Sequence, residues 1–112
     1  MPKTYVALIQ TGEDFQLLDI SIGGDGIADP AELSEIRIPD GVDWRKGVII
    51  NGRGPIWLYA FIVHQCHPAV WVAVMDPRQG GVVVEAHHPN APGVGSVIAV
   101  ERFQKYLRGK PV

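Results

Sequence analysis

Apolar and polar residues alternate along the N-terminal part of the chain in the period-two pattern of β-strands. Residues 4–10 form one such run, and residues 15–22 form a second, half-buried run after a short polar turn. Farther on, Asp29 is suited to cap a short helix that begins at Pro30 and carries Glu32 early, where negative charge favours the helix dipole. The pattern therefore predicts two partner strands followed by a short helix.

The middle of the chain predicts a strand, a helix and another strand. Residues 47–51 are apolar almost throughout. Pro55 suits the first helical position, and the helix is predicted to end at His67 because Pro68 disfavours helical geometry in the residue before it. Residues 70–75 form the next apolar strand. Two strands joined by a helix in this order imply a parallel pair with a right-handed crossover.

The remaining segments complete the predicted sheet. A turn over residues 79–81 leads into a strand over 82–86 that pairs antiparallel with its predecessor. A loop rich in Pro and Gly over 89–95 precedes a final strand over 96–100, and the amphiphilic tail from Glu101 is compatible with a short helix. We expect an α/β fold, a single domain of 112 residues. It combines a mixed sheet of about six strands, a central strand–helix–strand crossover unit and one short extra helix.

The central helix is unusual because it is apolar nearly all round. Residues 56–63 read IWLYAFIV and offer no polar face, which a helix on one side of an exposed sheet normally has. Two explanations stay open at this point. A second subunit covers the outer side of the helix, or the N-terminal hairpin or the tail covers it.

Composition narrows the class of protein. With 46% apolar and 20% charged residues, the chain has the composition of a folded domain. A formal charge of −2 gives no basic footprint for duplex DNA or for an anionic membrane, although a small anionic ligand remains compatible. Cys66 is the single cysteine, so no internal disulfide is expected. Residues 55–63, the longest apolar run, are too few to cross a bilayer, and the N-terminus has no signal-peptide pattern; we expect a cytoplasmic protein.

A glycine-rich turn is the first candidate for chemistry. Gly52, Arg53 and Gly54 lie between a strand and a helix N-terminus, where backbone N–H groups and the helix dipole favour an anion. Arg53 adds a planar phosphate donor. Trp57 occupies the place of the third glycine of a dinucleotide fingerprint, and no Walker lysine follows, which argues against those two sites. The alternative is a tight turn whose glycines serve only the backbone.

Histidines near the end of the predicted helix are the second candidate. His64 and His67 are three residues apart and would share a helix face, but two histidines alone are fewer ligands than a metal normally needs. We predict that His64 is buried and hydrogen-bonded, and that His67 is more exposed and more suited to chemistry. Cys66 is interpreted as a core residue.

The third candidate follows the second strand of the crossover unit. Asp76 suits a hard cation and Arg78 a phosphate, although Asp-Pro also fits a simple β-turn. His87 and His88 follow the next strand, where a solvated loop is the plain alternative. The tryptophans are interpreted as core residues: Trp44, Trp57 and Trp71.

Residues 46–88 resemble a small protein family associated with type III CRISPR systems. The resemblance is carried by the G-R-G-P-I-W-L stretch over 52–58, by His67 near the helix end, and by D-P-R over 76–78. Members of that family are manganese-dependent ring nucleases that cleave cyclic tetra-adenylate, the second messenger of type III interference, and so end the antiviral response. Members are also described as removing adenylate from RNA 3′ ends. A non-catalytic sensor that binds the ring is the alternative from another class.

The resemblance implies a role for each matched residue. His67 corresponds to the catalytic histidine, Asp76 to an essential aspartate, and Arg78 to an arginine suited to the scissile phosphate. His67 and Asp76 are also the implied Mn²⁺ ligands, since this ion accepts imidazole and carboxylate. The substrate-binding positions are Gly52, Arg53, Gly54 and His87.

The predicted topology separates these residues within one chain. The carboxyl ends of both parallel strands lie on one edge of the sheet, which places Asp76 and Arg78 with the glycine-rich turn. The helix carries His67 to the opposite edge, and the antiparallel strand carries His87 there as well. We therefore predict a homodimer through the apolar helix, and ligand-driven head-to-tail association of dimers into a tetramer or filament, with the ring between a histidine edge and an aspartate edge.

Overall fold

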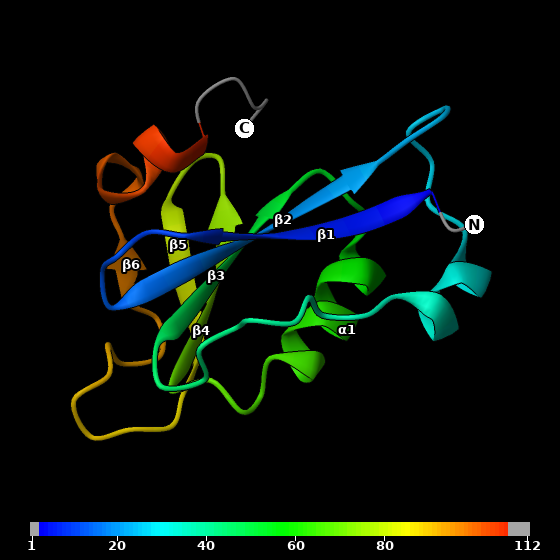
Figure 1. Ribbon diagram of the computed structural model, residues 1–112. Helices are drawn as coiled ribbons and strands as arrows, with labels where there is room; N and C mark the ends of the chain where they lie inside the picture. The colour runs from blue at the N-terminus through cyan, green and yellow to red at the C-terminus, as the bar shows by residue number, and fades with distance from the viewer. Residues whose placement is uncertain (1–2, 108–112) are drawn as a thin grey trace.

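Six strands form one mixed sheet in which spatial neighbours follow the order of the chain (Figure 1). The computed structural model describes residues 3–107. The strands are β1 (Thr4–Gln10), β2 (Phe15–Ile22), β3 (Gly47–Gly52), β4 (Trp71–Asp76), β5 (Gly80–Ala86) and β6 (Val97–Ile98). β2, β3 and β4 run parallel to one another, and the pairs β1–β2, β4–β5 and β5–β6 are antiparallel. The predicted α/β fold with a mixed six-stranded sheet is confirmed.

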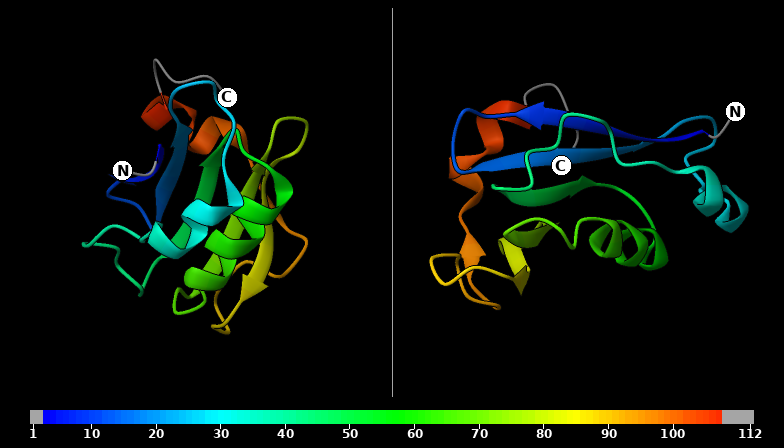
Figure 2. Two further views of the ribbon diagram at one scale, coloured as in Figure 1. Left: turned by 90° about the vertical axis from the view of Figure 1, so that its right-hand side faces the viewer. Right: turned by 60° about the horizontal axis from the view of Figure 1, so that its bottom comes forward.

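The crossover helix α1 (Ile56–Gln65) joins β3 to β4 and covers one face of the sheet (Figure 2). Pro55 is its N-cap rather than its first helical residue, with φ −70° and ψ 158°. The helix ends at Gln65, so the predicted end at His67 was two residues too late. Cys66 leaves helical geometry at ψ 6°, and residues 66–68 form a turn. Pro68 disfavours helical geometry in His67, so the helix does not resume there. His64 and His67 therefore do not share a helix face.

The β4–β5 turn lies two residues earlier than predicted. It spans residues 77–79, and Gly80 and Gly81 belong to β5. The Asp76 carboxylate accepts the N–H groups of Arg78 and Gln79 at 2.7 and 3.3 Å, which closes the turn early. β3 and β4 each extend one residue farther at their carboxyl ends than predicted.

The C-terminal segment also differs from its predicted form. The final strand has two residues instead of five, because it pairs only with Gly81 and Val82 before the chain bends into two short 3₁₀ helices. These are η2 (Val100–Arg102) and η3 (Gln104–Leu107), where one short helix was compatible with the pattern. Phe103 and Leu107 are buried against the sheet, which explains why this amphiphilic segment packs down.

The short helix near the N-terminus is a 3₁₀ helix, η1 (Pro30–Glu35), with the predicted aspartate cap. Asp29 and Glu32 form a capping box, and Glu32 also accepts the backbone N–H groups of Lys3 and Thr4 at 2.6 and 3.2 Å. The hydrogen bond from the Asp29 N–H is the largest cause that lowers the pKa of Glu32. Glu32 thereby ties the helix to the first strand of the sheet.

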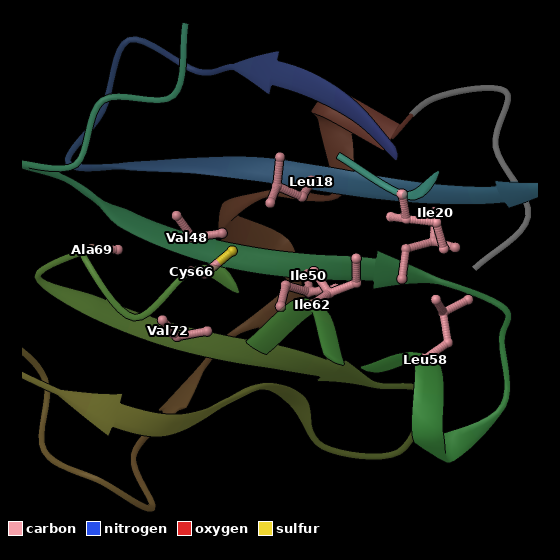
Figure 3. Close-up of a cluster of buried hydrophobic side chains, with 10 residues drawn as sticks. Leu18, Ile20, Val48, Ile50, Leu58, Ile62, Cys66, Ala69 and Val72 are labelled. Atoms are coloured by element: carbon pink, nitrogen blue, oxygen red, sulfur yellow. The ribbon is translucent and has the colours of Figure 1, made fainter. Parts of the chain in front are cut away.

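Two apolar cores lie on opposite faces of the sheet. The helix-face core packs α1 against β2, β3 and β4 (Figure 3) and includes Cys66, which is fully buried as predicted. The tail-face core packs the C-terminal 3₁₀ helices against the other face. Trp71 is buried in the tail-face core, whereas Trp44 and Trp57 are only partly buried against the helix-face core. The interpretation of all three tryptophans as core therefore holds fully for one and partly for two.

The outer side of α1 is only partly covered. Residues 33–44 pack against the same core as the helix, whereas the described part of the tail packs on the opposite face. Ile56 remains 89% exposed and Ala60 is exposed as well. The described part of the tail, up to residue 107, therefore does not cover the outer side of α1. The homodimer through this helix stays a prediction. None of the helices formed by residues 3–107 has both the length and the apolar character that a membrane span requires.

Candidate metal centre

Three side chains converge where β5 ends and the turn after α1 begins. Glu85 Oε1 lies 2.9 Å from His87 Nε2 and 3.3 Å from His67 Nδ1. The two imidazole rings meet edge to face, with centroids 4.5 Å apart. One ligand atom from each of the three residues lies within 4.8 Å of the others. We call this group the His–Glu–His cluster.

A β-bulge in β5 brings Glu85 to this cluster. Glu85 pairs with Val72 of β4, whereas Val83 pairs with the residue that follows Val72, so Val84 is an extra residue. Val83 points into the tail-face core and Val72 into the helix-face core. Strict alternation would place Glu85 on the face of Val83, and the bulge turns it to the face of α1 instead. His87 follows two residues later and projects to the same face.

The cluster is open to solvent on one side and carries charge. The side chains of His67, His87 and Glu85 are 66%, 36% and 24% exposed. Partial burial raises the pKa of Glu85. The hydrogen bonds to His87 and His67, together with the charges of these two histidines, lower the pKa by more than burial raises it, so the net shift is downward. Glu85 is therefore a carboxylate at neutral pH. Two imidazole nitrogens and one carboxylate oxygen form a donor set that fits Mn²⁺, with room for water or a phosphate oxygen.

Glu85 was missed by the sequence reasoning. Its signal was its spacing from His87, because residues two apart on a strand share a face. The structure does not bring the two implied metal ligands together: His67 lies in the cluster, whereas Asp76 does not. Among residues 3–107, His64 is outside the cluster and exposed on the last turn of α1, so the prediction that it is buried was wrong.

Asp76 and Arg78 lie at the opposite end of the β4–β5 hairpin. Asp76 pairs with Gly80 next to the turn, whereas the other end of the ladder pairs Trp71 with Ala86 beside the cluster. The five residue steps between the two ends of β4 correspond to about 17 Å. The predicted separation of His67 from Asp76 within one chain is confirmed. Arg78 is exposed, and within the described part of the chain its guanidinium has no ionic partner.

The glycine-rich turn lies on the same edge as Asp76. Gly52 has φ 139°, and a Cβ atom there would lie 2.5 Å from the Ile20 carbonyl oxygen, so the backbone itself requires glycine. The Tyr59 hydroxyl donates to the Gly52 carbonyl. Arg53 is exposed and, with Gly54, lines a cavity of about 480 Å³ beside the start of α1. The turn therefore needs glycine for its backbone at Gly52 and leaves the Arg53 side chain exposed.

Comparison with known proteins places this α/β domain in a CRISPR-associated class. Residues 21–99 match the family described as CRISPR-associated protein (Cas_csx3), and the chain belongs to that family. A protein of Aquifex aeolicus (strain VF5) that carries the name "Uncharacterized protein" is 41% identical over 93 residues, which cover 80% of this chain and 81% of that protein. The family match spans both the His–Glu–His cluster and the edge that carries Asp76.

Proposed function

We propose that this protein is a metal-dependent phosphodiesterase that linearises cyclic tetra-adenylate and thereby ends type III CRISPR signalling. The observation that carries the proposal is the His–Glu–His cluster, a metal-ready donor set in a member of a CRISPR-associated family. The exposed edge with two arginines and an aspartate supports it, since the substrate is a ring of phosphodiesters.

His67, Glu85 and His87 would hold Mn²⁺. When bound, this ion supplies positive charge to a phosphate oxygen and increases the acidity of a water molecule. Glu85 Oε1 accepts hydrogen bonds from both imidazoles, which holds the three ligand groups close together before the ion would replace those protons. The exposure of His67 leaves one side of the cluster accessible to a large substrate.

The opposite edge would bind the ring through its phosphates. Arg53 and Arg78 offer planar guanidinium groups that can donate two parallel hydrogen bonds to one phosphate. Asp76 is held by the turn through Oδ1, which leaves Oδ2 to contact the substrate. Because the two edges are separated within one chain, the complete site would combine the cluster of one chain with the aspartate edge of another.

Cleavage of the ring tests the proposal directly. Purified protein is incubated with cyclic tetra-adenylate, with and without Mn²⁺, and the products are separated by liquid chromatography. We expect a linear product only with the metal, and a loss of at least about 10²-fold in His67→Ala but little change in His64→Ala, the exposed neighbouring histidine. Unchanged ring after hours at micromolar protein would contradict catalysis. Tight binding without turnover would indicate a sensor, and faster release of adenylate from linear RNA would indicate an exoribonuclease.

A further inference from the structure

A second cavity lies at the amino-terminal ends of β3 and β4. Its volume is about 430 Å³, within the range of small-ligand sites. Trp44, Val70 and Trp71 contribute its apolar lining. Its polar groups come from four residues: Asp14, Arg45, His88 and Asn90. An aromatic wall beside hydrogen-bonding groups is the arrangement on which nucleobases stack.

The Trp71 ring is held firmly in this cavity. It lies over the backbone of Gly47, where an added Cβ atom would be 1.9 Å from the ring. Trp71 is only 4% exposed, so the edge that lines the cavity belongs to a fixed ring. Trp44 also lines the cavity and is half-buried. Trp44 is therefore the indole that keeps surface for a flat heterocycle, and the buried Trp71 ring contributes a fixed edge beside it.

Asn90 supplies a hydrogen-bonding pair at this surface. Its backbone N–H donates to His88 Nδ1 at 3.1 Å, and the Ala91 N–H donates to the His88 carbonyl at 3.0 Å, which fixes the turn. Within residues 3–107 the side-chain amide of Asn90 has no hydrogen-bond partner. One donor and one acceptor in a single plane match the N6 and N7 atoms of adenine. Arg45, paired with Asp43 through Nε and Nη2, keeps its Nη1 donors for a phosphate.

The cavity and the His–Glu–His cluster share one strand end. The His87 N–H donates to the carbonyl of Val70 at 2.8 Å, and the side chain of Val70 lines the cavity. His87 belongs to the cluster and His88, the next residue, lines the cavity, as expected where an extended chain alternates between faces. We propose that the cavity is an adenine subsite, which holds one base of the substrate while a neighbouring phosphodiester reaches the cluster. This inference rests on the proposed function for the identity of the whole substrate.

Indole N–H resonances test the subsite without catalysis. Metal-free protein labelled with ¹⁵N is titrated with adenosine 5′-monophosphate. We expect the Trp44 and Trp71 signals to shift and the Trp57 signal, from the cavity beside Arg53, to stay in place. Ribose 5-phosphate should leave both signals unmoved, and uridine 5′-monophosphate should bind at least about five-fold more weakly. Asn90→Ala should remove this preference, and Gln104→Ala, an exposed amide outside the cavity, should keep it.

The subsite is overturned if the Trp44 and Trp71 signals stay silent, whether or not the Trp57 signal shifts. Ring cleavage by the wild-type protein, measured separately, distinguishes the two proposals. A protein that cleaves the ring while Trp44 and Trp71 stay silent overturns the subsite alone. A protein that shifts both signals but leaves the ring intact supports the subsite and overturns the proposed activity.

Discussion

Mixing two inactive variants tests whether the site is shared between chains. His67→Ala removes a ligand of the His–Glu–His cluster, and Asp76→Ala removes the carboxylate of the opposite edge. Each variant alone should retain about 1% of wild-type turnover or less, the scale of a lost acid–base or electrostatic contribution. Asp76 ends β4, whereas the cluster with His67 lies beside the opposite end of that strand, about 17 Å away by strand geometry, so one chain cannot place both against the same phosphate.

The expected rescue follows from the statistics of a head-to-tail contact. In an equal mixture, about one quarter of the contacts join the intact aspartate edge of a His67→Ala chain to the intact cluster of an Asp76→Ala chain. Turnover should therefore rise to about one quarter of the wild-type value, roughly 25-fold above either variant. Initial rates of ring cleavage are measured at fixed total protein, with each variant mixed with wild type as the control. A mixture as inactive as its components, while both variants fold and associate, would refute the shared site.

Three further predictions concern single positions. Glu85→Gln should lower Mn²⁺ affinity at least about tenfold in calorimetry with an unchanged circular dichroism spectrum, and unaltered affinity would exclude Glu85 from the metal centre. Burial, with a smaller contribution from the charge of Glu85, raises the pKa of Cys66 to about 12. Iodoacetamide should therefore leave the native protein unmodified at about pH 8, and rapid alkylation would show that the thiol is accessible. Gly47→Ala should cost at least about 2 kcal/mol in urea unfolding, because its Cβ would meet the Trp71 ring. Gly93→Ala, whose Cβ would meet only the Ser96 hydroxyl at an ordinary 3.9 Å, should change stability little, and equal losses would disprove the packing explanation.

The fold was predictable because most of its elements have a clear local sequence pattern. Two runs of alternating residues, two apolar strands and a proline-bounded helix define five of the ten elements formed by residues 3–107. Parallel pairing of β3 and β4 followed from the helix between them. The wrong predictions concern the ends of helices and strands, whose positions depend on a few hydrogen bonds. The turn closed by Asp76 and the early exit of the chain at Cys66 depend on such local contacts.

The candidate site was predictable only in part, for a physical reason. The topology separates His67 from Asp76. This separation could be predicted from the sequence, because a helix that joins two parallel strands carries its last residues to the opposite edge of the sheet. Convergence of three ligands was not visible, because it depends on how the strands are aligned. A period-two reading of β5 places Glu85 on the face of Val83, away from His67.

The extra residue in β5 reconciles two demands on one strand. Val83 must face the tail-face core, where it is 1% exposed, and Glu85 must face the opposite side to meet two histidines. A regular strand cannot satisfy both with residues two apart, because they would share a face. Val84 resolves the conflict by taking the additional position, and its side chain is left 42% exposed. The bulge therefore keeps the tail-face core continuous up to the strand end and still delivers a carboxylate to the candidate metal centre, which is the local re-aiming that bulges provide near functional sites.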